Sequence, residues 1–317
     1  MTAVWAELQL EDDELRVTVL PEKGADIVGF LHKPSGVDPL FRTPWGLQPP
    51  GSPPREGSDD HAFLENYGGG WQELFPNVND PSEYDGETVP FHGEVATLPW
   101  DVERDDEALR CSVRCRRTPF RLERLMRIKG GTLVLEETVT NEGDALAHFV
   151  WGHHCVVGPP FLEAGCRLRT PARTVETIPE LWEDTARLEP GQRSSWPNAR
   201  LRSGGEVDLS VVPGTEVESH DDVYLTDLEG GWAEVENPRL GFAFRLEWDP
   251  AVFRWIISWQ PYGGARAMPL AGSYALGVEP WVTRRSLADA VDADEAIALD
   301  PGARYVTILS ASMRRTD

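Results

Sequence analysis

The chain has 317 residues and a formal net charge of −23, because 53 acidic residues outnumber 30 basic ones. This excess argues against nucleic acid or an anionic membrane as a partner, since both bind clustered positive charge. No apolar run reaches the length of a membrane span, and the first residues carry neither the basic nor the apolar part of a signal peptide. We therefore expect a soluble, cytoplasmic protein.

Short runs of strand-forming residues, separated by turns rich in glycine and proline, make up most of the chain. In chain order, the predicted strands are 14–20, 109–115, 132–140, 145–151, 206–212, 223–228, 241–248, 252–259 and 304–313. One short helix is predicted over 286–291, with Ser286 as its cap. Strands at this spacing without helices between them favour a large antiparallel β-sandwich, and we expect one all-β domain over residues 1–317.

Two segments lack this strand pattern. Residues 44–60 are rich in Pro, Gly and Ser and are predicted to form a long surface loop. Residues 171–205 are weakly patterned and are predicted to pass over one face of the sandwich. Because strand texture resumes unchanged after each segment, neither is expected to link two independent cores.

The first candidate site is the segment Asn66–Asn77, which reads NYGGGWQELFPN. Three successive glycines let the backbone turn sharply or approach a ligand closely. No Lys or Ser/Thr follows them, so the segment does not fit a phosphate-binding loop. The side chains that offer an aromatic face and hydrogen-bonding groups are Trp71, Gln72, Glu73 and Asn77. The alternative is a glycine turn beneath a core tryptophan.

Glu279 lies in the run YALGVEPW, whose apolar residues predict that its carboxylate is partly buried. A buried carboxylate needs a partner or a function. The candidate partners lie far upstream: His92, and the adjacent pair His153 and His154. Neighbouring strand residues point to opposite faces, so only one of that pair should face a cleft. A glutamate base and a histidine acid from distant strands would suit proton transfer.

The same residues leave a metal site open as an alternative. His92, His154 and a carboxylate would match the two-histidine, one-carboxylate set of non-haem iron enzymes. The spacing of His92 and Glu94 would place both on one face of a strand.

Five short motifs follow one another along the chain. They are GGWQELFPN at 69–77, FHGE at 91–94, WGHH at 151–154, FRWIISWQ at 253–260 and LGVEPW at 276–281. Each motif alone is weak, but together they resemble the aldose 1-epimerase (galactose mutarotase-like) family over nearly the whole chain. The resemblance implies a β-supersandwich with a shallow sugar cleft on one sheet.

The resemblance also implies roles for single residues. Glu279 matches the catalytic base, and His154 matches the histidine that protonates the ring oxygen of the sugar. His92 matches a second cleft histidine, which holds the sugar or assists. Asp222 falls near the sugar-binding aspartate of the family, with Asp221 as the other choice. The implied substrate-binding residues are Trp71, Gln72, Glu73, Asn77, His153, Asp222, Gln260 and Trp281.

The implied reaction interconverts the α and β anomers of a hexose or related aldose by ring opening, without a metal or cofactor. Well-studied galactose mutarotases carry an arginine before the first histidine, whereas this chain has no Lys or Arg between Arg55 and Arg104. The chain therefore resembles a divergent branch of the family.

The acidic surroundings of the candidate site favour an uncharged sugar as the partner. The protein itself is expected to be a monomer or a homodimer. Two other functions stay open. One is a non-catalytic carbohydrate-binding protein. The other is a glycoside hydrolase, in which Glu73 or Glu94 would partner Glu279.

Overall fold

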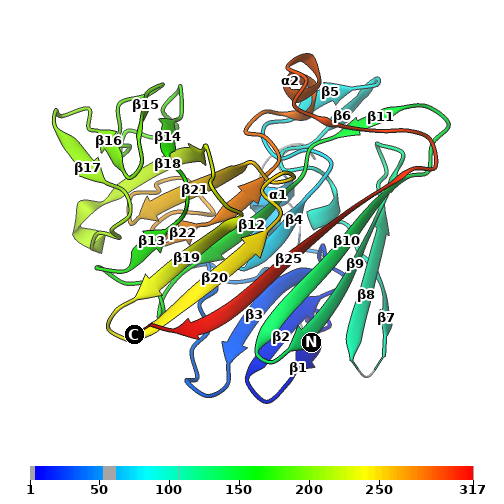
Figure 1. The fold of residues 1–317 in the computed structure, drawn as a ribbon, viewed down its shortest axis with the longest axis horizontal. Coiled ribbons are helices and arrows are strands. Elements are labelled where there is room, and N and C mark those ends of the chain that lie inside the picture. Colours follow the sequence, from blue (N-terminus) through cyan, green and yellow to red (C-terminus); the bar gives the residue numbers. More distant parts are fainter. Residues whose placement is uncertain (1–3, 53–61, 106, 317) are drawn as a thin grey trace.

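The computed structural model describes residues 4–52, 62–105 and 107–316, and its regular structure is nearly all antiparallel β-sheet (Figure 1). An eleven-stranded sheet and an eight-stranded sheet contribute to one shared hydrophobic core, and three two-stranded sheets lie at the margins. The all-β sandwich predicted from the sequence is confirmed. Within the described ranges, no helix is both long enough and apolar enough to span a membrane.

The large sheet has the strand order β1-β2-β3-β4-β12-β23-β21-β18-β14-β15, with β22 paired to β12. Its strands are β1 (Leu8–Glu11), β2 (Leu15–Leu20), β3 (Asp26–His32), β4 (Trp71–Leu74), β12 (Gly152–Val157), β14 (Thr174–Thr177), β15 (Arg193–Ser195), β18 (Ser219–Thr226), β21 (Trp255–Tyr262), β22 (Leu276–Gly277) and β23 (Glu279–Trp281). Strands that are far apart in the sequence, such as β4, β12 and β23, are therefore neighbours at its centre.

The small sheet has the order β13-β19-β20-β25-β10-β9-β8-β7. Its strands are β7 (Asp101–Arg104), β8 (Ala108–Arg114), β9 (Phe120–Lys129), β10 (Thr132–Asn141), β13 (Arg167–Arg169), β19 (Trp232–Asn237), β20 (Phe242–Trp248) and β25 (Arg304–Arg315). The two-stranded sheets pair β5 (Ser82–Tyr84) with β6 (Glu87–Val89), β11 (Ala147–Phe149) with β24 (Ile297–Leu299), and β16 (Asn198–Arg200) with β17 (Glu206–Asp208). The described helices are α1 (Ala62–Asn66), α2 (Leu287–Asp292) and two 3₁₀ turns, η2 (Val95–Thr97) and η3 (Thr215–Val217).

Alternation of side chains along each strand produces the sandwich. On β25, Leu309 and Ala311 are buried in the core, whereas Val306 and Ile308 are more than half exposed on the opposite face. Successive strand residues point to opposite faces of a sheet, so this period of two defines one apolar face for the core.

The large sheet differs because its centre is covered on both faces. All six residues of β12 are buried. One face contributes to the core shared with the small sheet, and a second hydrophobic cluster that includes Phe63, Tyr67, Trp259 and Trp281 lies on the other face. This second cluster forms the surroundings of the candidate site.

Several predicted elements have different bounds in the structure. The strand predicted over 206–212 is only β17 in the structure. The strand predicted over 145–151 contains only β11, and β12 begins directly after it at Gly152. The weakly patterned segment 171–205 contains β14, β15 and β16, which are short strands with partly exposed faces and so carry little apolar signal. Helix α2 follows Ser286 as predicted. Of the predicted loop 44–60, residues 53–60 lie outside the described residues.

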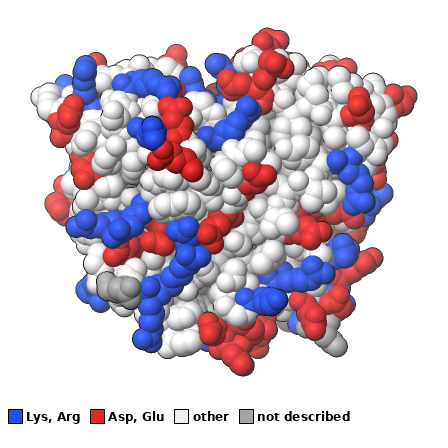
Figure 2. All heavy atoms as spheres, viewed as in Figure 1, with Lys and Arg blue, Asp and Glu red and all other residues white. Residues whose placement is uncertain are grey.

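The surface carries both signs of charge. Figure 2 shows acidic and basic side chains intermixed over the face that it displays. On this face the negative net charge is therefore distributed rather than gathered into one patch.

Candidate functional site

A cleft opens on the outer face of the large sheet, among the residues of the second hydrophobic cluster. Its empty volume is about 530 Å³ when the open solvent at its mouth is included. Five predicted site residues line it: His92, His154, Asp222, Glu279 and Trp281. The rest of the lining is mostly aromatic and includes Phe63, Tyr67, Tyr224 and Trp259.

Strand register brings Glu279 to His154. Gly152 on β12 pairs with Trp281 on β23, and the two strands are antiparallel. Moving two residues forward on β12 and two residues back on β23 therefore places His154 opposite Glu279. Both side chains point into the cleft, and His154 Nε2 is 3.7 Å from Glu279 Oε1. Neither residue is more than 7% exposed. The predicted pairing of this carboxylate with an imidazole from a distant strand is present in the structure.

His92 reaches the same cleft from a loop. Its backbone is left-handed, with φ of 61°, a conformation that non-glycine residues adopt rarely and that often marks a functional site. Its Nδ1 donates to the carbonyl oxygen of Val78 at 2.7 Å, which leaves Nε2 free to face the cleft. The ring centroids of His92 and His154 are 5.6 Å apart.

Burial controls the charges of these groups. It raises the pKa of Glu279 well above its usual value, and the nearby Asp222 adds to the rise. Burial likewise raises the pKa of Asp222. It lowers the pKa of His154 to about 3 and that of His92 well below its usual value. A low-dielectric cleft disfavours every charged form, so the neutral forms dominate when no ligand is bound.

Several buried polar atoms in the cleft have no hydrogen-bond partner within the described part of the chain. They are Glu279 Oε1, His154 Nδ1, Asp222 Oδ1 and the Tyr67 hydroxyl. Buried polar atoms are nearly always hydrogen-bonded in folded proteins, and each one left without a partner costs stability. A ligand that carries several hydroxyl groups would supply the missing partners.

The choice between the two neighbouring aspartates follows from β18. Asp222 pairs in register with Trp259, and both line the cleft. Asp221 points to the other face, where its carboxylate accepts hydrogen bonds at 2.7 Å from the backbone N–H and the Nε–H of Arg187. Asp222 is therefore the aspartate available to a ligand.

Three of the predicted substrate-binding residues, Trp71, Glu73 and His153, lie instead between the two sheets. They form a buried polar cluster with Arg124, which reaches across from the small sheet. Arg124 donates to Glu73 and, at 2.8 Å, to Glu137 Oε1. These residues are removed from the cleft because they occupy the alternate strand positions that face the core.

Hydrogen bonding fixes the form of His153 in this core cluster. The indole N–H of Trp71 donates to His153 Nδ1 at 3.2 Å, so the ring proton lies on Nε2, 3.1 Å from Glu137 Oε2. Burial and the charge of Glu137 raise the pKa of Glu73 to about 7. Burial opposes ionisation of Glu137 too, but His153 and Arg124 lower its pKa to about 2. Glu137 is therefore the carboxylate that stays ionised beside the guanidinium.

The predicted residues Gln72, Asn77 and Gln260 are also absent from the cleft lining. Gln72 faces the same side as its cross-strand partner His154, but its amide donates to Asp26 Oδ2 at 3.0 Å and to the carbonyl of Gly69 at 2.8 Å. Asn77 joins loops by donating to Pro90 and accepting from Leu287. Gln260 donates to Ser258 Oγ at 3.1 Å. Their side-chain amides are therefore used in hydrogen bonds within the protein and not in the cleft.

The donor sets do not favour a metal in the cleft. Among the described residues, the one group of three close potential ligands is Glu73, Glu137 and His153. The Arg124 guanidinium already supplies positive charge to that group. Glu94 does not join His92, because its carboxylate accepts hydrogen bonds from the backbone N–H groups of residues 116 and 117.

Most of the aromatic wall was not predicted. Tyr67 stands directly before the three glycines, and Trp259 lies within the FRWIISWQ motif, so both had a nearby signal. Phe63 and Trp182 lie in segments without any strand or motif pattern. Only the folding of those segments against the sheet brings them to the cleft.

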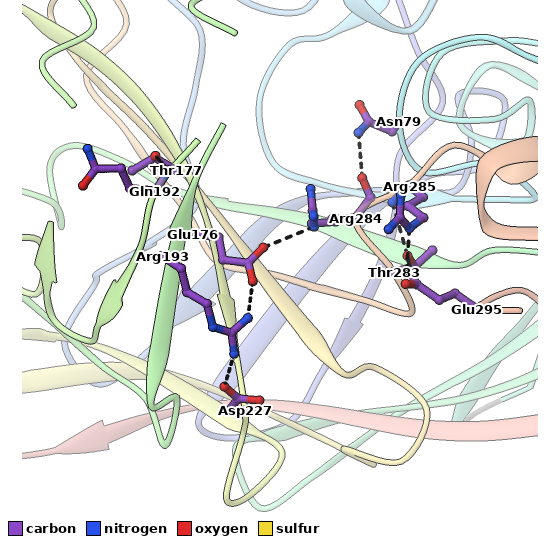
Figure 3. A network of polar contacts seen from close by, with 10 residues as sticks. All are labelled: Asn79, Glu176, Thr177, Gln192, Arg193, Asp227, Thr283, Arg284, Arg285 and Glu295. Carbon is purple, nitrogen blue, oxygen red and sulfur yellow. Dashed lines mark hydrogen bonds and ion pairs between the residues drawn. The ribbon is translucent and has the colours of Figure 1, made fainter. Parts of the chain in front are cut away.

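A polar network holds the rim beside Tyr224 (Figure 3). Asn79, which lines the cleft, donates to the backbone oxygen of Arg284 at 2.9 Å. The Arg284 guanidinium pairs with Glu176 at 3.4 Å and stacks over Tyr224 at 5.6 Å. Glu176 also pairs with Arg193. The positive charge of Arg284 beside this rim is therefore already paired.

Comparison with known sequences gives one family. The sequence model described as Domain of unknown function (DUF4432) matches residues 5–313. No curated protein matches the chain.

Comparison with solved structures identifies the fold. The Slr1438 protein from Synechocystis sp. PCC 6803 is similar with a TM-score of 0.70 at 17% identity, covering 100% of this chain and 98% of that one. A galactose mutarotase related enzyme from Lactobacillus acidophilus has a TM-score of 0.68 at 17% identity, covering 98% and 99%. A GalM/aldose epimerase homologue from C. elegans has a TM-score of 0.65 at 14% identity, covering 99% and 100%. At these identities the likeness establishes a galactose mutarotase-like fold.

Proposed function

This chain belongs to the family described as Domain of unknown function (DUF4432), and from that premise we propose that it is an aldose 1-epimerase. The family description assigns no reaction, so the proposal depends on the cleft. One observation carries it: His154 and Glu279 are buried proton-transfer groups with a ring nitrogen and a carboxylate oxygen 3.7 Å apart. The galactose mutarotase-like fold and the unpartnered polar atoms of the cleft support the same reaction.

In the proposed reaction, Glu279 removes the proton of the anomeric hydroxyl while His154 donates a proton to the ring oxygen. The bond between the anomeric carbon and the ring oxygen breaks, and the former O–H electron pair completes the aldehyde carbonyl. Rotation about the C1–C2 bond presents the other face of the carbonyl, and the ring closes with both proton transfers reversed. Both side chains recover their starting protonation, so nothing is consumed.

The two positions of a single proton on the pair correspond to the two stages of this reaction. Before ring opening the proton is on His154 and Glu279 is ionised, whereas afterwards Glu279 holds it and His154 is neutral. Burial favours the second arrangement, because it raises the pKa of Glu279 and lowers that of His154 to about 3. The transfer that opens the ring thus removes charge from a buried pair.

The proposed substrate is an uncharged sugar. No Lys or Arg is among the described residues that line the cleft, whereas Asp222 and Glu279 are. The nearby Arg284 is already paired with Glu176. A sugar phosphate would meet carboxyl groups without a compensating cation, and unpaired buried charge is costly.

The direct test is polarimetry of freshly dissolved α-anomers of glucose and galactose with the purified protein. We expect mutarotation to accelerate above the spontaneous rate in proportion to protein concentration. Calorimetric binding of sugar without acceleration would instead identify a non-catalytic carbohydrate-binding protein. Tighter binding of a hexose 6-phosphate than of the free hexose would contradict the proposed substrate class.

A further inference from the structure

An exposed tryptophan stands at the mouth of the cleft. Trp182 belongs to the cleft lining and yet is 56% exposed, whereas Glu279 in the same cleft is 1% exposed. Trp182 is therefore at the outer end of the cleft and Glu279 at its inner end. An exposed aromatic ring beside a cleft offers a flat apolar face on which a ligand can stack.

The residue after Trp182 anchors this part of the rim. Glu183 accepts hydrogen bonds from the backbone N–H groups of Arg266 and Ala267, at 2.9 and 3.0 Å. It also accepts from His220 Nδ1 at 2.9 Å, and His220 Nε2 in turn accepts from the indole N–H of Trp259 at 2.7 Å. The segment with Trp182 is thus bound to a second loop and to the wall of the cleft.

These hydrogen bonds favour the charged form of Glu183. Burial acts to raise the pKa of Glu183, but the hydrogen bonds from His220 and from the two backbone N–H groups outweigh it, so the pKa is lowered. A charged carboxylate forms stronger hydrogen bonds than a neutral one. The exposure of Trp182 is therefore a property of a fixed rim and not of an unattached loop.

The lining of the cleft continues from Glu279 at its inner end to Trp182 at its outer end. A ligand of more than one sugar ring would contact both.

We propose that Trp182 is the platform of an outer subsite, and that the substrate is the reducing end of an uncharged di- or oligosaccharide. This inference rests on the proposed function. The reducing ring places its anomeric carbon at His154 and Glu279, and the next ring stacks its apolar face on the Trp182 indole. The linkage must involve a hydroxyl remote from the anomeric carbon, which has to stay free for ring opening.

The test compares monosaccharides with reducing disaccharides in wild type and Trp182→Ala. Polarimetry would follow glucose and galactose beside maltose, cellobiose and lactose. For at least one disaccharide, wild-type kcat/KM should exceed that for its reducing-end monosaccharide. Trp182→Ala should lower that disaccharide value by up to about tenfold, the scale of one aromatic contact, and change the monosaccharide value less than about twofold. Trp182→Phe should restore most of the loss.

Leu181→Ala is the matched control, because Leu181 is the exposed neighbour outside the cleft lining and should leave both substrates unchanged. Equal losses for both substrate classes in Trp182→Ala, or no loss for either, would overturn the subsite. If the wild type accelerates the mutarotation of no sugar, the proposed function is wrong. Calorimetric measurement of sugar binding then tests the subsite alone. In that case a disaccharide must bind more tightly than its monosaccharide, and Trp182→Ala must abolish the difference.

Discussion

At the scale of single residues, the cleft keeps Glu279 and His154 in forms that water would not favour. Among the described residues that line the cleft, no Lys or Arg offers either of them a positive charge. Burial of this kind shifts pKa values toward those that proton transfer requires, which is why such groups concentrate at active sites.

Replacement of Glu279 by Gln keeps the shape of the side chain and removes the group that accepts and returns a proton. We expect kcat/KM for mutarotation to fall by roughly 10²–10⁴-fold, the usual contribution of a positioned acid or base. Circular dichroism and thermal melting should stay close to wild type. Glu236→Gln, a surface carboxylate paired with Arg169, is the control that should retain activity. Near-normal turnover by folded Glu279→Gln protein would exclude Glu279 as the base.

The pH dependence of kcat/KM should be a broad bell. Activity requires one proton on the pair, so it falls below the pKa of His154, about 3, where both members are protonated. It falls again above the raised pKa of Glu279, where neither holds a proton. Subtracting the spontaneous rate at each pH gives the profile of the free enzyme. An acid limb near 6.5, the usual pKa of histidine, would contradict the neutral state of His154.

At the scale of elements, the sandwich is joined across its core by a charged cluster as well as by apolar contacts. Arg124 on β9 reaches Glu73 on β4, which belongs to the other sheet, and Glu137 on β10. His153 on β12 completes the cluster. Because β12 carries both His153 of this cluster and His154 of the cleft, a disturbance of the cluster should also reach the candidate site.

Removing Arg124 should destabilise the protein strongly. Arg124→Met leaves Glu73 and Glu137 buried without their guanidinium, and breaking a buried pair in this way costs about 3–5 kcal/mol. The control is Arg193→Met, whose ion pairs are on the surface and should be worth less than about 1 kcal/mol. Urea unfolding gives both values. If Arg124→Met does not fold, adding Glu137→Gln should recover folded protein, because it removes the carboxylate that stays ionised. Equal stability of Arg124→Met and Arg193→Met would contradict the assignment.

At the scale of the whole molecule, buried neutral histidines couple stability to pH. The pKa of His154 is lowered from 6.5 to about 3 in the folded chain, and that of His92 is also lowered. At these two histidines the unfolded chain binds more protons than the folded chain between these limits, so their contribution to the free energy of unfolding decreases as pH falls from about 6.5 towards 3.

Urea midpoints at pH 7 and pH 5 test this coupling. Relative to wild type, His154→Asn should become more stable as the pH falls from 7 to 5, because it lacks the group whose protonation favours the unfolded chain. Glu279 and Asp222 act in the opposite sense, since their raised pKa values favour the folded chain as pH falls. The comparison with His154→Asn isolates the histidine from them. Parallel changes of stability with pH in the two proteins would show that His154 does not contribute.

The sequence alone predicted the architecture and the residues of the candidate pair. Alternation along the strands specifies an all-β sandwich, because a period of two creates one apolar face per strand. The motifs around His92, His154 and Glu279 identified three side chains that share one cleft in the structure. The prediction of a single domain over the whole chain stays a prediction.

Only the tertiary structure decided which face each residue uses. In the pairing of β4 with β12, Glu73 lies opposite His153 and Gln72 lies opposite His154. The first pair faces the core, and the second pair faces the side of the sheet that carries the cleft. The sequence shows that successive residues of a strand face opposite sides of the sheet. Which side each one faces depends on the pairing of β4 with β12, whose residues are about 80 positions apart. Trp182 had no signal at all, because its place at the mouth follows from hydrogen bonds between Glu183 and distant loops. Long-range packing, not local pattern, made it part of the cleft.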